Sequence, residues 1–365
     1  MDLPLADIVA GPCTLRAPAE GDIDDMALAC SDEVLQRFLP LLPSPYTRAD
    51  AEQWVRVGAP ALWAGGGAAY TIDEDGGLAG HIGLRVHPQR DIVEVGYWVA
   101  PWARGRGIAT AATRAVVELA FDRGAARAEL LTLRANGRSQ RVALAAGFSY
   151  EAVCRGAAFD RDGHRADLLL WARLATDPDG PGPRPFPDLP GGELRDGVVR
   201  LRPRDPDDAI ALTETSADRE SQRWSTRAVP YTIEMQHLAI ERAESDWLLG
   251  ERIALTICDE PTGAPAGDVS IFWVDPVMGV VNMGYSVHPR WRRRGFATRA
   301  AYLTSEWLLG LPSVARVEAG ANVANTASQA VLRRAGFEHE GTLRSLVTSA
   351  DGPRQDIVLF SRVVS

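Results

Sequence analysis

One fourteen-residue pattern occurs twice in this chain and limits what the chain can fold into. Residues 96–109 read GYWVAPWARGRGIA and residues 284–297 read GYSVHPRWRRRGFA, so that Gly, Tyr, Val, Pro, Arg, Gly and Ala occupy the same relative positions. Each copy starts as an apolar strand, continues into a basic turn that contains glycine, and ends where a helix begins. A duplication of this kind predicts two copies of one folding unit in tandem.

The length and a proline-rich segment support two domains. A chain of 365 residues is about two domains long if a domain has roughly 100–200 residues. Residues 177–190 read DPDGPGPRPFPDLP, and such dense proline predicts an extended, semi-rigid spacer. We therefore expect a first domain over residues 11–175, a linker over 176–194 and a second domain over 195–364.

The periodicity around each copy of the pattern predicts an α+β fold. Alternating apolar runs typical of antiparallel strands precede each glycine turn, and apolar residues with helical spacing follow it. A further strand, a short helix and a late hairpin turn come next, with the turns at Asp162-Gly163 and Asp351-Gly352. The predicted order in each half is β-α-α-β-β-β-α-β-α-β-β. Each domain should thus contain a mixed, mostly antiparallel twisted sheet flanked by helices.

Charge and composition exclude several classes of partner. The net charge is −9, which disfavours nucleic acid and means that any anion-binding surface must be a local basic patch. No apolar run approaches the ~18 residues that a membrane span needs. The four cysteines lack metal-ligand spacing, and the first residues are acidic where a signal peptide would be basic. We expect a cytoplasmic protein without a metal, nucleic-acid or membrane partner.

The duplicated turn has the features of a pyrophosphate site. A helix N-terminus presents unpaired N–H groups and the positive end of the helix dipole. Gly105, Gly107 and Gly295 let a phosphate approach the backbone closely. Arginines add charge-assisted hydrogen bonds to phosphate. A solvated tight turn is the alternative, but the two copies have matched flanks, and this favours anion binding.

Further residues give the chain a family resemblance. Arg-x-x-Gly-x-Ala at residues 104–109 and 292–297 is followed by Asn-x-x-Ser at 136–139 and 325–328, and then by Gly-Phe at 147–148 and 336–337. This combination resembles the GNAT acetyltransferases, in particular the RimJ/RimL branch, over nearly the whole chain except the linker. The resemblance implies an N-acyltransferase that uses acetyl-CoA or another acyl-CoA and a primary amine of a small molecule, peptide or protein N-terminus.

The resemblance also assigns cofactor-binding positions to each half. In the first half they are Val99, Arg104, Gly105, Arg106, Gly107, Ile108, Ala109, Thr110 and Asn136. In the second half they are Val287, Arg292, Arg293, Arg294, Gly295, Phe296, Ala297, Thr298 and Asn325. The two asparagines would hydrogen-bond the pantetheine arm.

Acyl transfer to an amine needs a base for the ammonium proton. Glu94 precedes the first turn on its strand, and alternation points it away from Val93 and Val95, so it is our candidate base acting through water. Asn282 takes its place in the second half and cannot accept that proton. The first half is therefore expected to be the catalytic one. Glu129 and Glu318 are fallback bases or structural carboxylates.

The departing thiolate needs an acid, and the expected tyrosine is missing. Many GNAT enzymes place it four residues before Gly-Phe, where this chain has Ala143 and Leu332. The RimL-like pattern offers Ser139 and Ser328 instead. An ordinary helix-cap hydroxyl is the alternative reading of these serines.

Two alternatives stay open at this point. A longer acyl chain could come from CoA or from a carrier protein in specialised metabolism, with the acidic carrier meeting Arg290 and residues 292–294. The second domain could also be a non-catalytic acyl-CoA-binding module, because it has Asn282 in place of the acid.

Overall fold

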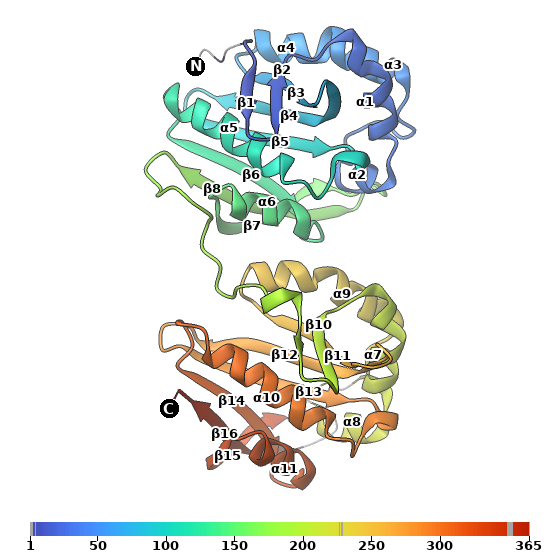
Figure 1. The fold of residues 1–365 in the computed structure, drawn as a ribbon, viewed down its shortest axis with the longest axis vertical. Coiled ribbons are helices and arrows are strands. Elements are labelled where there is room, and N and C mark those ends of the chain that lie inside the picture. Colours follow the sequence, from blue (N-terminus) through green and yellow to red (C-terminus); the bar gives the residue numbers. More distant parts are fainter. Residues whose placement is uncertain (1–2, 4, 226, 228, 349–352, 365) are drawn as a thin grey trace. The chain divides into compact units, whose positions relative to one another are not determined.

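The computed structural model describes residues 3, 5–225, 227, 229–348 and 353–364. The chain forms two units, residues 1–183 (the N-terminal unit) and residues 184–365 (the C-terminal unit) (Figure 1). Each contains one mixed sheet with helices on both faces, which confirms the predicted tandem α+β fold. The turn expected at Asp351-Gly352 lies outside the described residues.

The N-terminal unit follows the predicted element order, with an extra first strand and with the region between the second and third strands divided into several helical segments. Its elements are β1 (Ile8–Ala10), β2 (Cys13–Arg16), η1 (Glu20–Asp22), α1 (Ile23–Cys30), α2 (Glu33–Phe38), α3 (Arg48–Gln53), η2 (Trp54–Gly58), α4 (Ala59–Ala64), β3 (Ala68–Glu74), β4 (Gly77–His87), β5 (Ile92–Val99), η3 (Pro101–Ala103), α5 (Ile108–Asp122), β6 (Arg127–Leu133), α6 (Gly137–Ala145), β7 (Ser149–Phe159) and β8 (Arg165–Leu174).

The C-terminal unit repeats this order. Its elements are η4 (Pro190–Gly192), β9 (Leu194–Arg195), β10 (Val199–Pro203), η5 (Pro206–Asp208), α7 (Ala209–Ala217), α8 (Arg219–Trp224), α9 (Ile233–Leu248), β11 (Ile253–Asp259), β12 (Pro265–Asp275), β13 (Val280–Val287), η6 (Pro289–Trp291), α10 (Phe296–Leu309), β14 (Arg316–Asn322), α11 (Thr326–Arg334), β15 (Glu338–Thr348) and β16 (Arg354–Val363).

Both sheets are antiparallel except for one central pair of strands. The strand orders are β1-β2-β3-β4-β5-β6-β8-β7 and β15-β16-β14-β13-β12-β11-β10-β9. The parallel pairs are β5 with β6, in register from Ile92 to Val95, and β13 with β14, in register from Val280 to Asn282. Beyond Val95 and Asn282 the two strands of each pair are no longer paired, so the sheet opens beside the last residues of β5 and β13.

Successive residues of β5 show what lies on each face of the sheet. The Tyr97 hydroxyl reaches Ser139 on α6, whereas the Trp98 ring lies beside His81, whose other neighbour is Trp54 of η2. Neighbouring side chains of a strand point to opposite faces. Helices α5 and α6 therefore cover one face, and the helical segments between β2 and β3 cover the other.

The proline-rich segment does not behave as a free spacer. The Gly182 N–H donates to the Leu144 carbonyl at 2.7 Å, which ties the segment to α6. Phe186 is fully buried in the C-terminal core and stacks on Trp273 with ring centroids 4.6 Å apart. Proline removes backbone donors, but burying an aromatic ring of this size stabilises a packed position by about 2–3 kcal/mol. The single phenylalanine of the segment thus anchors it to the C-terminal unit.

Candidate functional site

The first glycine turn joins β5 to α5 at the edge of the opened sheet. Gly105 and Gly107 have φ of 78° and 76°, a left-handed conformation that favours glycine. Gly107 is the N-cap residue of α5 and makes no side-chain cap. A Cβ at either glycine would meet no protein atom within 4 Å. The turn therefore leaves open space beside a helix start whose first N–H groups receive no capping side chain.

The second turn repeats this geometry with one difference. Gly295 has φ of 83° and precedes α10, again without a side-chain cap. Arg293 occupies the position of Gly105 and adopts φ of 61°, which costs a residue with a Cβ about 1–2 kcal/mol. The C-terminal turn thus keeps the left-handed bend and adds a cation to it.

The first residues of the two helices divide into buried and accessible positions. Ile108 and Phe296 are buried in their cores, so only their backbone N–H groups can meet a ligand. The next two residues of each helix are partly exposed, namely Ala109, Thr110, Ala297 and Thr298. At these four predicted cofactor positions, a ligand can therefore reach both backbone and side-chain atoms.

The two motif arginines are held in the same way. Arg104 donates through Nε to the Val99 carbonyl at 3.4 Å and through Nη2 to Asp32 at 2.5 Å. Arg292 donates through Nε to the Val287 carbonyl at 3.1 Å and through Nη2 to Asp218 at 2.5 Å. Each guanidinium is thus fixed beside the end of its strand, where the motif places it.

The carboxylates that hold these arginines also cap short helices. Asp32 accepts the Leu35 N–H and begins α2, and Asp218 accepts the Ser221 N–H and begins α8. Burial opposes ionisation of both carboxyls, but the arginines and the cap N–H groups hold the pKa of Asp32 and of Asp218 below the ordinary value. Each motif arginine is therefore positioned by an ionised carboxylate from a distant part of its unit.

The other basic residues of the turns differ between the units. Arg106 pairs with Glu74 at 2.7 Å. Arg294 lies over the Trp291 ring at 5.1 Å from its centroid, and Arg293 is exposed. The C-terminal turn therefore presents more accessible positive charge than the N-terminal one.

A tyrosine–serine pair lies beside each opened strand. The Tyr97 hydroxyl is 2.7 Å from Ser139 Oγ, and the Tyr285 hydroxyl is 2.9 Å from Ser328 Oγ. Burial raises the pKa of Tyr97 well above its usual range and that of Tyr285 to about 12, although the hydrogen bond to serine lowers each. Both phenols therefore stay protonated near neutral pH and can donate a proton.

The motif spacing predicts the serines but not these tyrosines. The expected position for a tyrosine is on the helix before Gly-Phe, whereas the structure supplies one from the strand. The signal was present, because the tyrosine is one of the residues that the two copies of the pattern share.

The asparagines of the Asn-x-x-Ser motif begin the helices that carry the serines. Asn136 accepts the Ser139 N–H through Oδ1 at 3.1 Å, and Asn325 accepts the Ser328 N–H at 3.0 Å. The asparagine is therefore the N-cap of α6 and of α11, and the serine hydroxyls are not the caps. Capping by asparagine fixes the serine hydroxyl in reach of the tyrosine.

Glu94 lies opposite Arg85 on the neighbouring strand. Arg85 Nη1 is 2.7 Å from Glu94 Oε1, and His87 Nε2 is 3.9 Å from Oε2. Val93 and Val95 are buried while Glu94 is partly exposed, as strand alternation predicts. A carboxylate with about four lone-pair sites can accept from arginine and from a water at the same time.

The remaining carboxylates differ from Glu94. Glu129 and Glu318 each accept Nε of a neighbouring arginine, Arg127 or Arg316, at 2.7 Å. Each of these arginines also pairs with a second glutamate from the outer strand of its sheet. The two fallback bases are thus members of matched ion-pair networks. Asn282 lies opposite Phe272, so the C-terminal unit has neither member of the Glu94–Arg85 pair.

The other face of β5 carries an aromatic cluster. The His81 ring lies edge-on to Trp54 at 5.2 Å and beside Trp98 at 6.2 Å between centroids. Burial lowers the pKa of His81 to about 4, against a hydrogen bond to the backbone of Tyr70 that raises it. The imidazole is therefore neutral at physiological pH within an apolar, aromatic wall.

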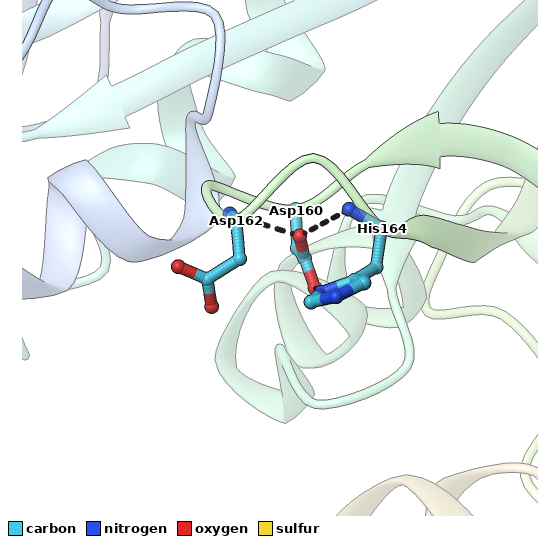
Figure 2. Close-up of side chains that lie close together, drawn as sticks. All are labelled: Asp160, Asp162 and His164. Carbon is cyan, nitrogen blue, oxygen red and sulfur yellow. Dashed lines mark hydrogen bonds and ion pairs between the residues drawn. The ribbon is translucent and has the colours of Figure 1, made fainter.

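An acidic turn between β7 and β8 places Asp160, Asp162 and His164 within 4.8 Å of one another (Figure 2). All three are exposed, and Asp160 accepts the backbone N–H groups of the other two at 3.0 and 2.8 Å. The hydrogen bonds lower the pKa of Asp160, that from His164 most. These contacts organise the hairpin turn that the sequence predicts here, and they account for the cluster.

The fold and the two turns define a class of protein: a tandem α+β protein with one glycine turn at an uncapped helix start and one opened strand pair per unit. A family model described as "Acetyltransferase (GNAT) domain" matches residues 13–149 and 199–338. The chain belongs to this family of GNAT acetyltransferases, and it is a two-domain N-acyltransferase.

Solved structures of acetyltransferases are similar to this chain. RimJ from Mycobacterium smegmatis in complex with CoA-disulfide is 25% identical, with a TM-score of 0.42, over 47% of this chain and 86% of that one. Ribosomal-protein-S5-alanine acetyltransferase from Vibrio fischeri is 18% identical, with a TM-score of 0.43, over 47% and 96%. A GNAT acetyltransferase from Bacillus anthracis is 15% identical, with a TM-score of 0.42, over 47% and 98%.

A search of the curated proteins found no match. Among the described residues no helix has the length and apolarity to cross a bilayer.

Proposed function

We propose that each unit binds an acyl-CoA, with the pyrophosphate on the glycine turn and the pantetheine arm along the open edge of β5 or β13. The observation that carries this proposal is the duplicated combination of an uncapped helix start and a strand that loses its parallel partner just before it. The unpaired N–H and C=O groups of an open strand edge can pair with the amides of pantetheine as a strand would. Family membership supports the same cosubstrate.

We propose that the N-terminal unit transfers the acyl group to a primary amine by direct attack. The amine nitrogen forms a bond to the thioester carbon, and the carbon–sulfur bond breaks. Glu94 takes the ammonium proton through a water, and its place opposite Arg85 fixes the carboxylate for this step. Ser139 gives its hydroxyl proton to the thiolate and receives one from Tyr97, which is 2.7 Å away. Solvent then returns a proton to Tyr97 and takes one from Glu94. An acetyl group is the donor that the family favours.

The C-terminal unit has the turn and the Tyr285–Ser328 pair but Asn282 and Phe272 in place of the acid and its arginine. This difference favours a second candidate role for that unit, binding of acyl-CoA without the water-mediated base of the first. The exposed arginines of its turn also suit the phosphate of a carrier protein's pantetheine arm, which is chemically the same arm.

Native mass spectrometry of the purified full chain with acetyl-CoA tests the proposal. We expect up to two bound equivalents, with one lost in Arg104→Glu and the other in Arg292→Glu. Arg195→Glu, at an arginine 66% exposed on β9 and outside both turns, is the matched control and should keep both. If neither acetyl-CoA nor CoA binds, the proposed function is wrong.

A further inference from the structure

A cavity in the C-terminal unit is lined by an unusual number of arginines. Its volume is about 280 Å³, close to the lower end of the ~300–1,000 Å³ typical of small-molecule sites. It lies between α9 and the sheet. The charged and polar residues that line it are Arg204, Arg227, Tyr231, Arg242, Asp246 and Arg252. Four cations face one carboxylate, so the cavity has an excess of positive charge.

Two of these arginines are built into the cavity and not simply exposed at its rim. The Arg204 side chain is only 6% exposed, and its Nη2 donates to Asp268 at 2.9 Å. Arg252 donates through Nη2 to Ser270 Oγ at 2.5 Å. The Nε atoms of both arginines are buried and have no hydrogen-bond partner among the described residues. Because these Nε atoms are not accessible from the cavity, a ligand there would be bound through the outer guanidinium nitrogens.

The equivalent positions of the N-terminal unit carry no arginine. Arg16 and Arg202 each donate to an aspartate six residues later in the chain, so these two arginines are equivalent. Arg204 therefore corresponds to Pro18. Thr71 donates to the first of these aspartates and Thr256 to the second, so the two threonines are equivalent. Arg252, four residues before Thr256, therefore corresponds to Gly67. Thr47 and Thr232 are the N-caps of α3 and α9 and are equivalent. Counting from these caps, Val57 is the position that corresponds to Arg242.

The partner of Arg204 differs as well. Gly80 and Gly267 lie against the same backbone atoms of the neighbouring strand in their units, so the two glycines are equivalent. The next residue, Asp268, therefore corresponds to His81 of the aromatic cluster. At the same place in the fold, the N-terminal unit therefore has aromatic, uncharged side chains and the C-terminal unit has arginines.

The cavity floor leads to the strand that carries the second glycine turn. Ala254 of the floor is in register with Ser270, and Ser270 is in register with Gly284 of β13. Asp268 is in register with Ser286, whose Oγ donates to it. The cavity thus lies on the face of the sheet opposite α10 and α11, two strands from the open edge of β13.

We propose that this cavity binds a small molecule that carries carboxylate or phosphate groups, and that an acidic amine of this kind is the acceptor of the C-terminal unit. The first part stands on the cavity itself, and the second rests on the acyl-CoA binding proposed above for the C-terminal unit. In this transfer the amine nitrogen bonds to the thioester carbon and the carbon–sulfur bond breaks. The ammonium proton passes to water, because Asn282 cannot accept it, and Ser328 gives a proton to the thiolate. Planar guanidinium groups pair with carboxylate and phosphate through two parallel hydrogen bonds. The N-terminal unit, with its aromatic wall, would take a different and less charged amine.

Isothermal titration calorimetry on the full chain tests the binding. The probes are L-glutamate, O-phospho-L-serine and cadaverine, an amine without an acidic group. We expect the two acids to bind and cadaverine not to bind. Arg242→Met and Arg252→Gln should each weaken glutamate binding by about tenfold or more, because each removes charge-assisted hydrogen bonds. Arg195→Met, at an arginine 66% exposed on β9 and outside the cavity, is the control and should leave affinity unchanged. Comparing the acids distinguishes carboxylate from phosphate.

Loss of Arg204 alone would leave the partly buried Asp268 carboxylate without its cation and with only the Ser286 hydroxyl as a donor, so that position is tested as Arg204→Met together with Asp268→Asn. If neither acid binds, or if cadaverine binds equally well, or if Arg242→Met and Arg252→Gln leave glutamate affinity unchanged, the cavity proposal is overturned.

A separate assay distinguishes the two proposals. In an Arg104→Glu chain, acetylation of glutamate is measured by mass spectrometry with acetyl-CoA. Binding of glutamate without its acetylation keeps the anion site and refutes its role as the acceptor site. Acetylation of cadaverine that is insensitive to the arginines also refutes the acceptor role of the cavity and keeps the transferase.

Discussion

The Tyr97 hydroxyl lies 2.7 Å from Ser139 Oγ, and the same contact recurs between Tyr285 and Ser328 at 2.9 Å. In each unit the tyrosine comes from the strand that loses its parallel partner, and the serine comes from a helix capped by asparagine. The recurrence in two units whose acceptor-side walls differ indicates that the pair serves what the units share. We assign it to the thioester end of the cosubstrate.

Tyr97→Phe should lower kcat of the N-terminal reaction about tenfold to a hundredfold and leave KM for acetyl-CoA nearly unchanged. The reason is that a proton donor acts in the transition state and general acid catalysis contributes on the order of 10²-fold or more. Release of CoA thiol from acetyl-CoA measures the rate.

The pH profile separates a chemical role of Tyr97 from a structural one. A positioning effect alone would scale the rate equally at every pH, whereas loss of the acid should slow turnover most at high pH, where solvent offers fewer protons. Tyr302→Phe, an exposed tyrosine of α10, is the control. An unchanged kcat in Tyr97→Phe would remove the tyrosine from the mechanism.

Glu94→Gln should slow turnover by about 10²-fold or more with acetyl-CoA affinity unchanged, because the amide cannot accept the ammonium proton. The Arg85 partner lies outside the cosubstrate turn, so Arg85→Met should change the rate less and shift its dependence on pH. Steady-state kinetics and calorimetric binding of CoA measure the two effects. Equal turnover in Glu94→Gln and the parent chain would contradict the assignment.

Local patterns predicted the tandem fold and the turns, because strand alternation, helical spacing and glycine positions act within a few residues of one another. The Tyr97–Ser139 contact joins residues 42 positions apart, and only the chain's path through the sheet brings them together. Nothing in the spacing of the serine motif specifies which strand faces it.

The same reasoning explains the two features that the sequence did not reveal. Phe186 is one aromatic residue within a run of proline and glycine, so composition predicts a spacer, whereas burial of that ring decides where the segment packs. Of the cavity arginines only Arg242 lies in a helix, and Arg204, Arg227 and Arg252 lie in connecting segments. As single charges in a chain with a net negative charge they read as solvated surface groups.

Arg293→Gly should raise the free energy of unfolding of the C-terminal unit by about 0.5–1 kcal/mol. Arg293 has φ of 61°, and relief of about 1–2 kcal/mol of left-handed strain outweighs the ~0.5–1 kcal/mol of added unfolded-state entropy. Its side chain is exposed, so little packing is lost. Urea unfolding measures the change.

Arg294→Gly is the matched control for Arg293→Gly, because Arg294 is not in the left-handed region, and it should be neutral or destabilising. Acetyl-CoA affinity should fall in Arg293→Gly if the arginine reaches phosphate. A more stable variant with weaker binding would show that the turn trades stability for charge, and a destabilised Arg293→Gly would contradict the strain argument.

Acid should destabilise the N-terminal unit through Asp22. Burial opposes ionisation of this carboxyl, but hydrogen bonds from Arg16, the Ala19 N–H and Thr71 hold its pKa below the ordinary value of 3.8. A group whose folded pKa is depressed stabilises the fold above its unfolded pKa and loses that contribution as pH falls through the folded pKa. The loss should therefore begin near pH 4 and increase below it.

Asp22→Asn removes this titration and leaves Asp73 as the remaining carboxylate partner of Arg16. It should lower the free energy of unfolding at pH 7 by about 3 kcal/mol, as expected when one partner of a buried pair is removed, and flatten the dependence of stability on pH below 4. Hydrogen exchange followed by peptide mass spectrometry assigns the effect to residues 1–183. Asp208→Asn should cause the same loss of stability in the C-terminal unit, because Asp208 makes the equivalent contacts with Arg202 and Thr256. Asp24→Asn, at an exposed carboxyl, is the control, and a pH dependence that survives in Asp22→Asn would assign acid sensitivity to other groups.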